Sequence, residues 1–172
     1  MRCLAATGNR PMEPRGACIG PLHADPAWID HNGHVNLPFY TVMFICAVTD
    51  VMNRYGLGEP YTARGDGSFF GVENHVRYLR ELRAGDSVLV DVRLLDHDAK
   101  RLHWYAAMSR ANGGADDGTR VASFELLSLH VDQRTRKVAP MPACVMRRVE
   151  AIRERDRVAG IPSDAGRVGI AR

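Results

Sequence analysis

The longest apolar stretch of the chain, residues 37–55, predicts one long buried helix. Its only formal charges are Asp50 and Arg54, and its apolar side chains point in nearly every direction at 3.6 residues per turn. At a rise of ~1.5 Å per residue such a helix would be about 28 Å long. Gly56 is a natural stop for it. We therefore expect the rest of the domain to cover most sides of this helix.

Alternation of apolar and polar positions predicts the strands. Four candidates follow the helix, at about residues 69–82, 88–94, 101–110 and 121–131, and a shorter one at about 17–25 precedes it. The turns between the later strands are short, whereas parallel neighbours would need crossovers of a dozen residues or more. We expect a five-stranded antiparallel sheet that curls round the helix, because the sheet has one apolar face to cover. This α+β outline is that of the hotdog fold.

The segments outside these elements show neither the helical nor the strand periodicity of apolar residues. Residues 1–16 are rich in Gly, Pro and Arg, which predicts a flexible tail. A short charged helix is expected at about residues 143–157, and a Gly-rich tail follows it. The predicted organisation is one hotdog domain at residues 17–142, with the N-terminal tail before it and a C-terminal helix and tail at 143–172.

The composition fits one ordinary globular domain. The 172 residues are 45% hydrophobic and 25% charged, and the net charge of +3 comes from scattered arginines rather than a basic stripe. We therefore expect no nucleic-acid partner. Cys3, Cys18, Cys46 and Cys144 form no CxxC pair, which favours free thiols in a reducing cytoplasm. With no apolar leader and no run of roughly 18 apolar residues, a cytoplasmic protein without a membrane partner is expected.

A polar cluster just before the apolar stretch carries the candidate chemistry. In the run WIDHNGHVN, Asp30 is followed by Asn32, Gly33 and His34. A carboxylate in such a loop can act as a general base on water or attack a carbonyl carbon directly. Glycine lets the backbone pass close to a ligand.

The start of the predicted helix adds a second chemical element. The first turn of a helix has unpaired N–H groups, and its dipole favours negative charge there. Pro38 has no N–H, so the nearest donors are those of Asn36 and Leu37. Such donors can stabilise the oxyanion that forms when a carbonyl is attacked.

Simpler explanations compete with these roles. An Asp or Asn before a helix is usually an N-cap, worth about 1 kcal/mol, and this applies to Asp30 and Asn36. His34 can simply hydrogen-bond the loop backbone, and His31 is expected to be exposed. A zinc site is a further alternative, with Asp30, His31, His34 and His75 as the ligands. The sequence lacks the HExxH helix pattern that would support it. We expect no metal.

The strand predicted at residues 69–82 places polar side chains on the face away from the helix. Glu73 and His75 belong to this face, and we expect the strand to be central in the sheet. A solvated or subunit-facing surface is the simplest explanation. The alternative is that Glu73, with His75 beside it, supplies a further polar group to the site from the same or a partner chain.

Three segments resemble a known family. DHNGHVNLPFY, residues 30–40, resembles the active-site segment of the 4-hydroxybenzoyl-CoA thioesterase group of hotdog enzymes, and its Asp, Asn, His, Val, Asn spacing is similar to acyl-acyl-carrier-protein thioesterases. FGVENHVRYLRELRAGDSVLV, residues 70–90, resembles small acyl-CoA thioesterases. Together with RLHWY, residues 101–105, it looks most like betainyl-CoA thioesterases.

The resemblance implies cofactor-independent hydrolysis of an acyl-CoA. Asp30 would be the general base or nucleophile, Asn32 and His34 would orient it or the water, and the Leu37 N–H would be an oxyanion donor beside Gly33. It also implies a homodimer or higher homo-oligomer with the site between subunits. Two other functions stay open, a hotdog enoyl-thioester hydratase and a non-catalytic module that binds acyl thioesters.

The residues that would hold the rest of the ligand are less well defined. Arg77 and Arg101 are candidates for the CoA phosphates. A betaine acyl group would favour aromatic faces, for which Trp28, Phe69 and Trp104 are among the candidates. Each of these side chains is also a plausible surface or core residue.

Overall fold

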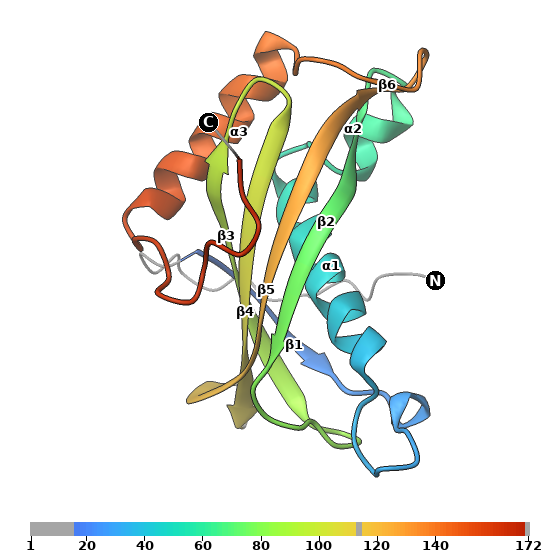
Figure 1. Ribbon diagram of the computed structural model, residues 1–172, viewed down its shortest axis with the longest axis vertical. Helices are drawn as coiled ribbons and strands as arrows, with labels where there is room; N and C mark the ends of the chain where they lie inside the picture. Colours follow the sequence, from blue (N-terminus) through green and yellow to red (C-terminus); the bar gives the residue numbers. More distant parts are fainter. Residues whose placement is uncertain (1–15, 113–114, 171–172) are drawn as a thin grey trace.

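A curled antiparallel sheet and one long helix, α1 (Leu37–Arg54), form the centre of the computed structural model, which describes residues 16–112 and 115–170 (Figure 1). α1 lies against one face of the sheet. The α+β hotdog arrangement predicted from the apolar pattern is therefore confirmed. The expected N-terminal tail, except for residue 16, lies outside the described residues.

Five long strands have the order β1-β3-β4-β5-β2, and each neighbouring pair is antiparallel. A two-residue strand, β6, adds to β5 and was not predicted. The bounds are β1 Ala17–His23, β2 Ser68–Tyr78, β3 Ser87–His97, β4 Arg101–Asn112, β5 Ala115–Asp132 and β6 Lys137–Val138; the helices are η1 Pro26–Trp28, α2 Glu59–Ala63 and α3 Ala143–Arg157.

β2, predicted to be central, lies at the edge of the sheet instead. Within the described residues it pairs with β5 alone. The strand ends at Tyr78, earlier than predicted, because the N–H groups of Leu79 and Arg80 both donate to the Val121 carbonyl, at 2.9 and 3.1 Å. Alternation tells which face a side chain occupies but carries no information on the order of the strands.

Phe44 of α1 and Phe124 of β5 mark the centre of the core. Their rings stack with centroids 5.0 Å apart, and both side chains are buried. α1 is nevertheless less enclosed than its apolar pattern predicts. Leu37 and Ile45 are 52% and 38% exposed, because the sheet covers only one side of the helix. These two apolar side chains on the open side of α1 are left uncovered.

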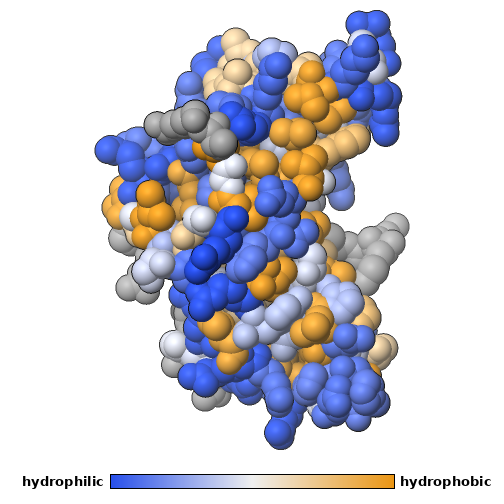
Figure 2. Space-filling view, in the orientation of Figure 1, coloured by the Kyte–Doolittle hydropathy of each residue, from blue (hydrophilic) through white to orange (hydrophobic). Residues whose placement is uncertain are grey.

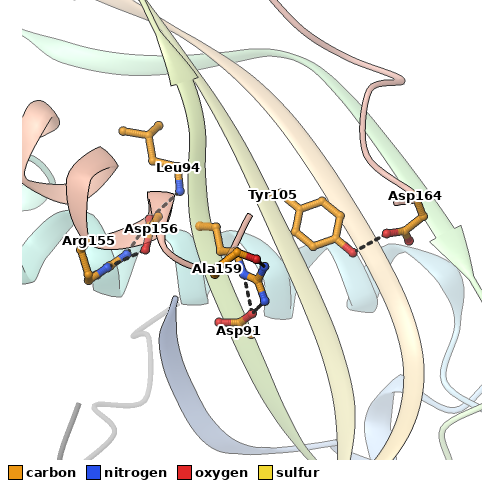
Figure 3. Close-up of polar contacts among 8 residues, drawn as sticks. Asp91, Leu94, Tyr105, Arg155, Asp156, Ala159 and Asp164 are labelled. Atoms are coloured by element: carbon orange, nitrogen blue, oxygen red, sulfur yellow. Dashed lines mark hydrogen bonds and ion pairs between the residues drawn. The ribbon is translucent and has the colours of Figure 1, made fainter. Parts of the chain in front are cut away.

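The two edges of the sheet differ. β1 pairs with β3 from Ser87 to Val92, and beyond that point α3 lies against β3. There the buried carboxylate of Asp156 accepts the N–H of Leu94 at 2.7 Å (Figure 3). This side chain replaces the missing strand partner, so β3 is covered beyond the end of β1. The edge strands are β1, with 7 residues, and β2, with 11, and within the described residues each pairs with a long strand on one side only.

The C-terminal segment crosses the sheet face opposite α1. The N–H groups of Gly166 and Arg167 donate to the Glu125 carboxylate, at 2.8 and 3.0 Å, and Tyr105 donates to Asp164 at 2.8 Å (Figure 3). Figure 2 shows that the surface of this face mixes hydrophilic and hydrophobic residues. Among the described residues, no helix combines the length and apolar composition needed to cross a membrane.

Candidate active site

Asp30 lies in a small closed turn directly before α1. Ile29 and Val35 form an isolated antiparallel bridge, and inside it the Asp30 N–H donates to the His34 carbonyl at 3.0 Å. The Gly33 N–H donates to the Asp30 carbonyl at 3.0 Å. Gly33 has a φ of 82°, in the left-handed region that glycine enters without steric cost. The turn therefore depends on glycine at this position.

Hydrogen bonds hold this turn against α1 and the segment between β2 and β3. The Val35 N–H donates to the Leu82 carbonyl at 2.8 Å, and the Leu82 N–H donates to the Tyr40 hydroxyl at 2.9 Å. The Asn36 N–H donates to the Trp28 carbonyl at 2.9 Å. The position of the turn is thus fixed relative to the start of α1.

The Asp30 carboxylate is held by its neighbours and is partly accessible. Its Oδ1 accepts the Asn32 N–H at 2.8 Å, and the Asn32 amide lies 3.4 Å from Oδ2. His34 Nδ1 lies 3.9 Å from Oδ1. The backbone hydrogen bond from Asn32 is the main cause that lowers the pKa of Asp30 below its ordinary value. An ionised carboxylate can act as a base or a nucleophile at neutral pH but not as an acid.

Neither residue that could be a simple helix cap acts as one. Asn36 occupies the N-cap position of α1 and makes no side-chain capping bond. The Asp30 carboxylate accepts a hydrogen bond within its own turn instead of from the first turn of α1. Asn36 is thus the N-cap residue by position, but neither side chain makes the capping hydrogen bond.

Leu37 carries the N–H that stays available at the start of α1. The Asn36 amide is already bonded to Trp28, and Pro38 has no N–H. For the Leu37 N–H, the described part of the chain supplies no acceptor. The residue is half exposed, and the first turn of the helix contains no acidic residue. No acidic residue within α1 itself therefore offsets the positive end of the helix dipole.

The other predicted site residues lie elsewhere in this chain. Glu73, His75 and Arg77 follow one another on the outer face of β2, and Arg77 forms an ion pair with Asp164 at 3.5 Å. Arg101 lies at the β3–β4 turn, where it pairs with Asp98 at 2.6 Å, at the opposite end of the sheet from the Asp30 turn (Figure 1). The structure thus holds Asp30, Asn32, Gly33 and His34 in one turn that leads into Leu37. Glu73, His75 and Arg77 are on a different element, the outer face of β2.

Sequence reasoning missed two groups of polar residues. Tyr40 and Tyr78, at the helix start and the end of β2, have rings in edge-to-face contact, with centroids 5.3 Å apart. On the outer face, Glu125 is 2% exposed and its Oε2 lies 2.9 Å from His103 Nε2. The sequence feature that could have indicated this group is Glu125 itself, the single charged residue in the mostly apolar run VASFELLSL. Among the described residues no group of His, Cys, Asp or Glu is placed to hold a metal ion.

Comparison with protein families matches residues 24–149 to the thioesterase-like superfamily. Among curated proteins, the betainyl-CoA thioesterase of Pseudomonas aeruginosa is 35% identical over 143 residues, which are 83% of this chain and 87% of that protein. The L-carnitine dehydrogenase/betainyl-CoA thioesterase of Agrobacterium fabrum is 33% identical over 144 residues, 84% of this chain but 28% of that longer protein.

Solved structures share the fold. A hypothetical protein of Staphylococcus aureus in complex with CoA has a TM-score of 0.75 at 24% identity, covering 87% of this chain and 92% of that one. A Pseudomonas putida protein described as a candidate thioesterase has a TM-score of 0.73 at 30% identity, covering 91% of this chain and 97% of that one. The first of these likenesses concerns the fold alone.

Proposed function

The chain belongs to the thioesterase-like superfamily, and from this premise we propose that it hydrolyses an acyl-CoA thioester to a free acid and CoA. The observation that carries the proposal is an ionised carboxylate, Asp30, held in a fixed turn that leads directly into α1, where the Leu37 N–H has no acceptor among the described residues. Thioester hydrolysis needs these two elements, a group that activates water or replaces it, and a donor for the oxyanion.

In the general-base form of the mechanism, Asp30 accepts a proton from water while the water oxygen attacks the thioester carbonyl. The Leu37 N–H donates to the oxyanion of the tetrahedral intermediate. The intermediate collapses, the C–S bond breaks, and the CoA thiolate leaves with the proton that Asp30 held. In the nucleophilic form, Asp30 attacks the carbonyl itself, the thiolate leaves, and water hydrolyses the mixed anhydride.

Asn32 and His34 have supporting roles in this proposal. The Asn32 N–H and amide hold both oxygens of the Asp30 carboxylate, at 2.8 and 3.4 Å, which restricts its rotation. His34 lies 3.9 Å from the same carboxylate, too far for a direct hydrogen bond but close enough to orient a water molecule between them.

We further propose that two copies pair through β2. Within the described residues β2 is an edge strand of 11 residues, longer than the 7-residue β1 at the other edge. Most of the large apolar side chains that remain exposed lie on β2, just beyond its end, or on the open side of α1: Phe70, Val72, Tyr78, Leu79, Leu37 and Ile45. A second copy of the same edge, run antiparallel, would pair the backbone and cover this surface.

The acyl group proposed is small and cationic, as in betainyl-CoA. The support is the 35% identity to the Pseudomonas aeruginosa betainyl-CoA thioesterase across most of both chains. The aromatic candidates named from the sequence now divide into two groups. Trp104 is fully buried in the core, whereas Trp28 and Phe69 are partly accessible.

A thiol-release assay over a panel of acyl-CoAs tests the function, with betainyl, short-chain, long-chain and aryl thioesters. Wild type should release CoA from at least one of them, and Asp30→Asn should reduce this release by orders of magnitude. Asp25→Asn is the matched control, because Asp25 accepts a backbone N–H at 2.8 Å in the neighbouring turn. Equal activity of Asp30→Asn and wild type would contradict the assignment. Loss of enoyl absorbance without thiol release would identify a hydratase, and binding without either reaction a non-catalytic module.

A further inference from the structure

A groove lies at the end of α1 that is far from Asp30, between α1, α2 and the first residues of β2. Its volume is about 370 Å³, within the ~300 to 1,000 Å³ typical of small-ligand sites. Met52, Leu57 and Phe69 supply an apolar wall, and Glu59 supplies a carboxylate at the rim. None of the catalytic residues proposed above lines this groove.

Glu59 has a fixed backbone and an uncommitted side chain. Its N–H donates to Asn53 Oδ1 at 2.7 Å, which holds the start of α2 against the end of α1. No described residue forms a hydrogen bond or ion pair with its exposed carboxylate. A carboxylate beside an apolar and aromatic wall suits a compact cation that carries methyl groups, because the wall contacts the methyls and the carboxylate balances the charge.

The groove is too distant to serve the Asp30 turn of its own chain. Leu37 and Thr49, a groove residue, are both on α1. At ~1.5 Å per residue their separation along the helix is on the order of 18 Å. A small acyl group attached to a thioester at Leu37 cannot extend this far.

Pairing through β2 removes this separation. When two antiparallel copies of Ser68–Tyr78 overlap fully, Ser68 of the second copy lies opposite Tyr78 of the first. The Tyr78 hydroxyl donates to the Leu37 carbonyl at 3.4 Å, and Ser68 lines the groove. A two-fold axis perpendicular to the sheet keeps both helices on the same side. The groove of one copy therefore opens beside the start of α1 in the other.

We propose that this groove, supplied by the second copy, receives an acyl group that ends in a trimethylammonium cation, with Glu59 as its charge partner and Phe69 as its aromatic wall. The inference rests on the proposed thioesterase function and names the specificity subsite of that reaction. It assigns the two ends of the substrate to different chains, with the carbonyl at Asp30 and Leu37 of one and the cation at Glu59 of the other.

Two thioesters of nearly equal shape provide the test. Betainyl-CoA carries a trimethylammonium group, and tert-butylacetyl-CoA carries carbon in place of the charged nitrogen. Glu59→Gln should lower kcat/KM for betainyl-CoA about tenfold, the scale of losing one close charge pair, and leave kcat/KM for tert-butylacetyl-CoA unchanged. The unchanged rate shows that the variant is folded. Glu150→Gln, which changes an exposed carboxylate on α3, should alter neither rate.

Each outcome has one meaning. If Glu59→Gln leaves the preference for betainyl-CoA unchanged, or lowers both rates equally, the subsite is wrong while the thioesterase function stands. If neither wild type nor Asp25→Asn releases thiol from any member of the panel, the proposed function itself fails.

Mixed dimers test the division between chains. Asp30→Asn and Glu59→Arg would each be poorly active on betainyl-CoA alone. The two variants are co-expressed with different tags, and the mixed dimers are isolated. Each mixed dimer would contain one intact site, with Asp30 from the Glu59→Arg chain and Glu59 from the Asp30→Asn chain. Such dimers should recover about half of the wild-type rate, as expected for one working site in two. Mixed dimers as inactive as the parents would overturn the assignment of the groove to the second copy.

Discussion

The Tyr40 hydroxyl accepts the backbone N–H of Leu82 at 2.9 Å, and this bond joins α1 to the segment that holds the Asp30 turn. Tyr40→Phe removes only that oxygen and leaves a buried N–H without its partner. We expect the free energy of unfolding to fall by about 1 to 3 kcal/mol, the cost of an unsatisfied buried donor. Urea denaturation followed by tryptophan fluorescence measures it. Tyr78→Phe, which removes a longer bond of 3.4 Å on an exposed side chain, should cost less. An equal loss in both variants would contradict the role of the Tyr40 hydroxyl.

The pH dependence of hydrolysis follows from the state of Asp30. A base or nucleophile must be ionised, so activity is present above its pKa and is lost as the pH falls through it. The Asn32 N–H lowers this pKa below the ordinary value of 3.8. We therefore expect kcat/KM to show no loss from Asp30 protonation between about pH 5 and 8. Stopped-time thiol assays across this range measure it. A drop near neutral pH that disappears in His34→Asn would move the proton transfer from Asp30 to His34.

The sequence predicts the inner architecture well because that architecture depends on local periodicity. The apolar stretch became α1, and the alternating runs became strands with their apolar faces toward it. The order of the strands depends on pairings between distant segments, so the edge position of β2 was not predictable. The partners of charged side chains were likewise not predicted, as the ion pair of Arg101 with Asp98 shows.

The candidate site was predictable to the extent that it is continuous in sequence. Asp30, Gly33 and Leu37 lie within one turn and the start of one helix, so spacing alone brought them together. The contacts of Glu125 were not predictable, because its partners at residues 166 and 167 lie some 40 positions away in a segment without a period. A second chain, which the proposed groove requires, leaves no signal in the local pattern.

Glu125 should contribute strongly to stability at neutral pH. Burial by itself raises the pKa of this carboxyl, but the N–H groups of Arg167 and Gly166, together with His103, outweigh it, and the net pKa lies below the ordinary 4.5. Its contribution is therefore present above the unfolded-state pKa and is lost as the pH falls through the folded-state pKa. Glu125→Gln should lower the free energy of unfolding at pH 7 by on the order of 3 kcal/mol.

Denaturation of wild type and Glu125→Gln at several pH values measures this effect. The difference between the two proteins should be largest near pH 7 and should shrink as the pH falls below 4.5 and through the lower folded-state pKa of this carboxyl. Because Glu125 lies on the outer face, the variant should keep its kcat at temperatures where it remains folded. A difference that is constant with pH would show that Glu125 acts through packing rather than charge.

Val72 provides the most direct test of pairing through β2. It is 52% exposed, next to the middle of the strand, at an irregularity in the pairing with β5. A change here should therefore leave the chain's own ladder intact. In an antiparallel pair of β2 strands the two copies of this position would lie close to each other, so Val72→Asp would place like charges side by side, which is destabilising. We expect wild type to sediment as a dimer or larger assembly and Val72→Asp to shift toward the monomer.

If the subsite also depends on the second copy, hydrolysis of betainyl-CoA should fall with the dimer fraction. Val138→Asp is the matched control, since that valine is 46% exposed on β6. A monomeric wild type with full activity would rule out pairing through β2 as a requirement for the site.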